Sequence, residues 1–156
     1  MTVRDIDKGY AALVRAVDRL DRSGVSVTVG IHESEGGVEH PSASSATVAE
    51  VAALAEFGTS SQPPRSFIRA AADEERAAMG AAMAEAARRV TRGAAVPAAF
   101  GEVGRDLLRA MRVRMDRAEP LDADTVDARG GSTPLDDTGT VRSALRVRVN
   151  GAEVAS

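Results

Sequence analysis

The sequence predicts an α+β fold, in which a small, mainly antiparallel sheet packs against long amphipathic helices. Apolar residues recur at helical spacing in three long segments. Two short segments, 25–31 and 145–149, instead alternate apolar and polar residues, which is typical of half-buried strands. At 156 residues the chain suits one domain, 1–156, with a single core. Only 3% of residues are aromatic, so we expect a modest aliphatic core that gains stability from neighbouring subunits.

Three long helices are predicted. The first covers about residues 4–22, and its buried face is expected to hold Ile6, Tyr10, Leu13, Val14, Val17 and Leu20. The second begins at a Ser66 cap and runs to about Arg92, with many alanines that allow another helix to approach closely. The third covers about 98–117, with Phe100, Val103, Leu107, Leu108, Met111 and Met115 on its apolar face.

The C-terminal part predicts a short helix followed by a β-hairpin. Asp137 or Thr138 can cap a helical turn at 141–144, and the strand 145–149 follows. Asn150-Gly151 is a strong two-residue hairpin signal, so 152–154 is expected to return as a short strand.

Two polar segments, about 32–45 and 118–134, are predicted to be flexible loops. The first contains possible metal ligands, namely His32, Glu33, Glu35, Glu39 and His40. The second is followed by further acids, and the acidic residues of this region are Asp122, Asp124, Asp127, Asp136 and Asp137. Neither set has the fixed spacing of a metal site, so we predict no bound metal and no cofactor.

Between the first strand and the second helix, residues 47–69 predict a rigid corner. Thr47 and Glu50 form a capping-box pattern, and Gly58 can end the helix that they begin. Pro63-Pro64 then imposes an extended approach to the next helix. We expect Phe57 to be buried at the end of the first helix, so that Phe57→Ala costs about 3–5 kcal/mol.

Glu56 is disfavoured where this sequence places it, because a helix C-terminus carries partial negative charge. It could pair with Arg65 or Arg69, face a neighbouring subunit, or simply lie exposed to solvent. These alternatives make the corner a candidate contact region.

The charge pattern argues against a nucleic-acid-binding protein without excluding one. The formal net charge is −3. The helix at 98–117 nevertheless has a basic side formed by Arg105, Arg109, Arg112, Arg114 and Arg117. A small regulatory protein that contacts DNA through Arg105–Arg117 is therefore the alternative hypothesis.

Catalytic patterns are missing from the sequence. It has no dinucleotide or phosphate-binding glycine motif, no Gly-x-Ser-x-Gly elbow and no cysteine. A hydrolase with an acidic site remains a third hypothesis, but nothing positions a carboxylate pair, and we predict that the protein is not an enzyme. No apolar run approaches the roughly 20 residues of a membrane span, so we expect a soluble protein made in a cytoplasm.

Two ordered motifs resemble a known family. Residues 48–59 end in Glu-Phe-Gly-Thr and residues 64–69 read Pro-Arg-Ser-Phe-Ile-Arg. Further on come Glu-Pro-Leu at 119–121, Thr125, and Pro-Leu-Asp-Asp-Thr-Gly-Thr-Val-Arg at 134–142. In this order, over roughly 25–149, the motifs resemble those of tailed-bacteriophage tail-completion and tail-component (neck) proteins.

The resemblance implies an α+β virion structural protein at the head–tail connector (neck) or proximal tail end, made in the host cytoplasm. It implies a homo-oligomeric ring, a hexamer by the symmetry of a phage tail, that meets a tail terminator, a connector or stopper, or the tail tube. It implies no membrane and no sequence-specific nucleic acid, although DNA can pass through the assembly. Candidate interface residues are Glu56, Phe57, Arg65, Phe67, Arg69, Asp137, Thr138 and Arg142.

Overall fold

The computed structural model describes residues 9–41, 45–60, 63–117 and 139–155. In these ranges the chain forms an α+β fold, as the sequence predicts. The described elements follow the order α1 (Tyr10–Ser23), β1 (Val27–Ile31), α2 (Glu33–Gly36), α3 (Val48–Phe57), α4 (Ile68–Glu74), α5 (Arg76–Thr91), α6 (Val96–Arg117), α8 (Thr140–Ala144), β2 (Leu145–Val149) and β3 (Ala152–Val154).

The described strands form one antiparallel sheet in the order β1-β2-β3. Val27, Val29 and Ile31 of β1 lie opposite Val149, Val147 and Leu145 of β2. The predicted hairpin is present, with Asn150 and Gly151 both at positive φ, which suits a two-residue turn. The Asn150 side chain also accepts a hydrogen bond from Ser26 N at 2.9 Å, which fixes the start of β1 to the hairpin.

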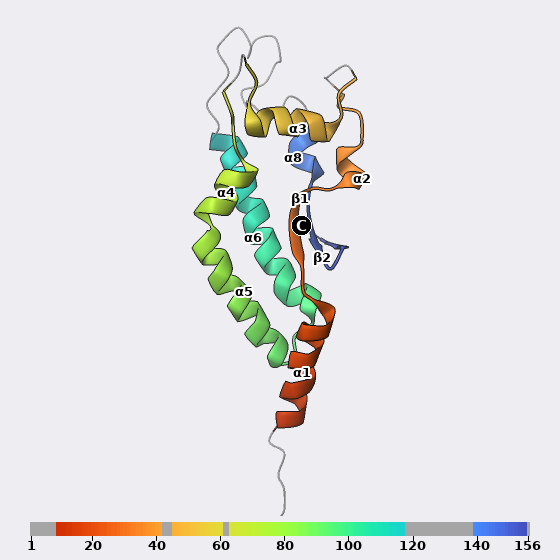
Figure 1. The fold of residues 1–156 in the computed structure, drawn as a ribbon, viewed down its shortest axis with the longest axis vertical. Helices are drawn as coiled ribbons and strands as arrows, with labels where there is room; N and C mark the ends of the chain where they lie inside the picture. Colours follow the sequence, from red (N-terminus) through yellow and green to blue (C-terminus); the bar gives the residue numbers. More distant parts are fainter. Residues whose placement is uncertain (1–8, 42–44, 61–62, 118–138, 156) are drawn as a thin grey trace, which may run out of the picture.

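The described part of the chain is layered, with the sheet on one side, α6 across its face and α5 packed behind α6 (Figure 1). Close approach of α6 to the sheet depends on Gly104. A Cβ atom there would lie 2.3 Å from Val147 Cγ1 and 3.1 Å from Val27 Cγ1, so any side chain would push the layers apart.

Buried residues gather in two clusters along the molecule. One surrounds Phe67 and Met111 and joins α3, α4, α6 and α8 to the sheet. The other surrounds Phe100 and Val90 and joins the far end of α5 to α6 and the hairpin. The predicted core of mainly aliphatic side chains is thus present, and each cluster also contains one phenylalanine, Phe67 in the first and Phe100 in the second.

Several predicted boundaries need correction. The helix expected from 66 to 92 is two helices, because the backbone at Glu75 departs from helical geometry (ψ 0°) between α4 and α5. The segment expected to be a loop at 32–45 includes α2 and a bridge between Glu39 and Thr47. Of the predicted 118–134 loop nothing is described.

The largest correction concerns the first helix. The face expected to be buried is largely exposed on α1, at 74% for Tyr10, 45% for Leu13, 38% for Val14 and 49% for Val17. Instead α1 packs on α5, and the residue that α1 buries is Ala16, which is only 2% exposed and is not part of the predicted face. The amphipathic pattern therefore located a helix correctly but did not show which surface covers it.

Candidate interface at the α3–α4 corner

The corner begins with a capped helix. Thr47 Oγ1 accepts a hydrogen bond from Glu50 N at 3.3 Å, while Thr47 N donates to Glu50 Oε2 at 2.7 Å, so the predicted capping box is confirmed. At the other end Gly58 has φ 75° and donates from its N–H to Leu54 O at 2.9 Å. These two stops fix Glu56 and Phe57 in the last turn of α3.

After the proline pair the chain returns to the end of α3. Arg65 N donates to Ala55 O at 2.8 Å. This hydrogen bond holds the extended segment after Pro64 against α3. This contact places residues 66–69, which open α4, directly against Glu56.

The Glu56 carboxylate caps α4 from outside that helix. It accepts hydrogen bonds from the backbone N–H groups of Phe67 at 2.8 Å, Ile68 at 3.0 Å and Arg69 at 3.1 Å. The Ser66 hydroxyl donates to it at 2.7 Å and Arg69 Nε at 2.9 Å. The carboxylate is thus unfavourable for its own helix but favourable at the positive N-terminus of the next one.

Glu56 is only 3% exposed, which settles the alternatives that the sequence left open. It pairs with Arg69 inside the chain, and the alternative that it lies exposed to solvent is excluded. Burial by itself raises the pKa of the Glu56 carboxyl, but hydrogen bonds from Ile68 N–H, the Ser66 hydroxyl and Arg69 outweigh that effect. The pKa is therefore lowered, and the group is a carboxylate at neutral pH.

Arg69 connects the buried carboxylate to the surface. Its Nη2 donates to Glu56 O at 3.1 Å, and its guanidinium carbon lies 4.6 Å from the centre of the Phe57 ring. Both side chains are open to solvent, at 56% for Arg69 and 64% for Phe57. An aromatic ring with a cation held over one face is thus presented outward from a rigid support.

The predicted burial of Phe57 is wrong, because the return of the chain after Gly58 brings Phe67 into the core instead. Phe67 is 0% exposed, so its aromatic ring is enclosed by this chain and offers no surface to a neighbour. Of the other predicted interface residues, Arg142 donates to Asp116 and to Arg112 O. Asp137 and Thr138 lie outside the described residues.

Sequence reasoning missed how Ser66 is used. It was expected to cap a helix, and its hydroxyl does accept from Ala70 N at 3.2 Å, but it also donates to Glu56. Sequence reasoning also missed the stacking of Arg69 on Phe57. The only signal in the sequence was an arginine that follows the Phe57-Gly58 turn at the start of the next helix.

Two of the five arginines on the basic side of α6 are paired with acidic groups. Arg109 pairs with Asp106 on the same helix at 2.8 Å. Arg114 reaches across to Glu74, with Nε 3.0 Å from Oε2. Because these cations are paired, the described α6 does not present an uninterrupted basic stripe of the kind that binds phosphates strongly.

Other kinds of site have little support in the described ranges. There, no group of three or more His, Asp or Glu side chains is arranged to hold a metal ion. No described helix is both long and apolar enough to span a bilayer.

Comparison with known proteins gives no assignment: no family model, curated protein or solved structure matches this chain.

Proposed function

We propose that this chain is a virion structural protein of a tailed bacteriophage. It acts at the head–tail connector or the proximal tail end as a tail-completion or assembly protein, through contacts that close a homo-oligomeric ring. The basis is the ordered pair of motifs at 48–69 and 119–142, which resembles the neck-protein family.

The observation that carries the proposal is that the first motif folds into a rigid corner with an exposed side-chain pair. Its two halves, Glu-Phe-Gly-Thr and Pro-Arg-Ser-Phe-Ile-Arg, bind each other through the Glu56 carboxylate. Phe57 from the first half and Arg69 from the second form an exposed pair on that support. Aromatic and arginine side chains on a rigid base are the residue types that most often dominate protein interfaces.

In the proposed assembly the Phe57–Arg69 pair contacts a neighbouring copy or an adjoining neck or tail protein. A hexamer is the ring size that matches a phage tail, and a head-to-tail contact that closes by rotation produces such a ring. The proposed partners are the tail terminator, the connector or stopper, and the tail tube, and DNA passes through the ring without sequence-specific contacts.

Complementation of a phage that lacks this chain tests the proposal. Phe57→Asp should leave the chain folded but yield heads without joined tails in electron micrographs, because a charge replaces the exposed ring. The matched control is Ala84→Asp, which places the same charge at an exposed position on a different helix, α5, and should restore normal particles. Normal tailed particles with Phe57→Asp would contradict the proposed contact, and normal particles without the chain would contradict the function.

A further inference from the structure

The exposed face of α1 has the pattern of a docking helix. Tyr10, Leu13, Val14 and Val17 occupy positions i, i+3, i+4 and i+7 and are between 38% and 74% exposed. This set, here called the α1 stripe, has the spacing with which amphipathic helices anchor in grooves. It contains no charged residue.

No other element in the described part of the chain covers the α1 stripe. The chain holds α1 by other residues, namely the buried Ala16 and the partly buried Leu20, which packs with Phe100 and Val90. Most of the large apolar residues of α1 thus face solvent rather than the chain's own core. An apolar helix face of this kind is expected to be covered by a second surface.

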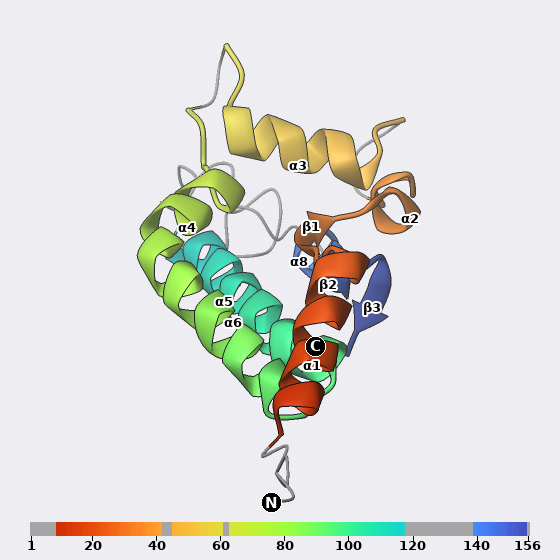
Figure 2. The same cartoon turned by 60° about the horizontal axis from the view of Figure 1, so that its bottom comes forward.

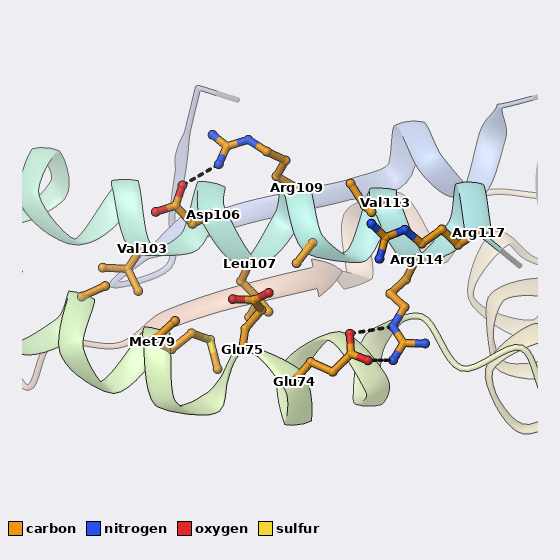
Figure 3. Close-up of a pocket in the computed structure, with 13 residues that line it drawn as sticks. Glu74, Glu75, Met79, Val103, Asp106, Leu107, Arg109, Val113, Arg114 and Arg117 are labelled. Atoms are coloured by element: carbon orange, nitrogen blue, oxygen red, sulfur yellow. Dashed lines mark hydrogen bonds and ion pairs between the residues drawn. The ribbon is translucent and has the colours of Figure 1, made fainter.

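A groove of suitable form lies between α5 and α6. It has a volume of about 470 Å³ and runs from Val103 to Arg117 along α6 and from Glu74 to Ala82 along α4 and α5. Ala78, Ala82 and Ala110 are too short to fill the space between the two helices. Figure 3 shows Met79 and Leu107 inside it and the Glu74–Arg114 ion pair bridging it.

Length and charge match between the stripe and the groove. The α1 stripe extends over about 11 Å, and the groove over about 12 Å on the α5 side and 21 Å on the α6 side, at 1.5 Å per helical residue. Of the charges along the groove, Glu74 is paired with Arg114 and Asp106 with Arg109. Much of the charge is therefore neutralised internally, which suits an uncharged occupant.

We propose that the α1 stripe of one copy lies in the α5–α6 groove of the next copy. The inference specifies a ring contact of the function proposed above and rests on it. In Figures 1 and 2, α1 lies at one end of the molecule, beside the C-terminal end of α5, whereas the groove lies along the other half of α5, from Ala82 toward α4. The two surfaces differ, so the contact is head-to-tail and can continue from copy to copy until a ring closes.

The area involved sets the expected strength. Four such side chains expose roughly 400 Å², and even an equal area on the groove would leave the contact below the roughly 1,200 Å² of a stable interface. A single contact is therefore weak, and the isolated chain should be mainly monomeric when dilute. Closure of the ring gives every copy two such contacts.

The absence of cysteine from the chain makes cross-linking a direct test. Full-length Val14→Cys, in the stripe, is mixed at high concentration with Ala78→Cys, in the groove, and treated with a short thiol-specific cross-linker. A heterodimer should form from the mixture in at least fivefold excess over the dimers that either variant forms alone. The matched controls are Ala11→Cys, exposed on another side of α1, and Ala84→Cys, exposed on α5 away from the groove residues.

Each alternative outcome overturns the inference. A Val14→Cys homodimer would show that two α1 stripes pair with each other, and equal cross-linking by the controls would show random collision. No cross-link would show that the groove is empty or covered by another segment. Because particle complementation is measured separately, a failed cross-link with normal incorporation into virions would reject this contact while leaving the proposed function standing.

Discussion

Replacement of Glu56 probes the corner most sharply, because one carboxylate supports both halves of it. In Glu56→Ala the N–H groups of Phe67, Ile68 and Arg69 lose their acceptor. Loss of a helix cap costs about 1–2 kcal/mol, and removal of one member of a buried charged pair costs about 3–5 kcal/mol. Arg69 is partly solvated, so we expect a total loss near the lower end of the second range, about 3 kcal/mol.

The assay is reversible denaturant unfolding followed by circular dichroism, with thermal melting alongside. A loss of about 3 kcal/mol corresponds to a decrease in Tm of roughly 6–12 °C for a chain of this size. Glu85→Gln is the matched control, because its exposed pair with Arg88 lies within α5, and it should change stability by less than about 0.5 kcal/mol. If Glu56→Ala costs less than about 1 kcal/mol, or no more than the control, the cap does not hold the corner together.

The same carboxylate predicts a pH dependence. Because its pKa is lowered in the folded protein, its contribution to stability is complete above the unfolded pKa of about 4.3 and is lost as pH falls through the folded pKa. Glu56→Gln should therefore be less stable than the parent at pH 7, and the difference should shrink on acidification below about pH 4. An unchanged difference down to pH 2 would contradict the assigned charge.

Two further pairs of variants test the packing. Phe67→Ala should cost about 3–5 kcal/mol, whereas Phe57→Ala, which removes an exposed ring, should cost less than about 1 kcal/mol, and the reverse order would contradict the assigned burial. Gly104→Ala should destabilise by about 1–3 kcal/mol because its methyl group would meet Val147. Gly80→Ala, in open space on α5, should instead stabilise by roughly 0.5–1 kcal/mol, and equal effects of the two would refute the close approach of α6 to the sheet.

Local signals in the sequence predicted the elements well. The Thr47 capping box, the Asn150-Gly151 hairpin and the alternation at 145–149 each depend on a few neighbouring residues, and the structure has all three. The strand predicted at 25–31 starts two residues too early, since β1 begins at Val27. The α+β class follows from these local patterns together.

The errors concern long-range packing. Phe57 ends one helix and Phe67 immediately precedes the next, and only the return of the chain after Gly58 decides which ring enters the core. The apolar pattern of α1 likewise indicates a face that needs cover, but the sequence does not say whether that cover comes from the same chain. The acceptor role of Glu56 was one of several open pairings, because a cap supplied by another helix has no local signature.

The proposed role in a virion is tested by the copy number of this chain in purified particles of the phage that we propose encodes it, determined by quantitative mass spectrometry. We expect a small fixed number per particle, six for one ring. We also expect heads that fail to join tails to lack the chain. A chain that is made during infection but absent from complete tailed particles would contradict the proposed function.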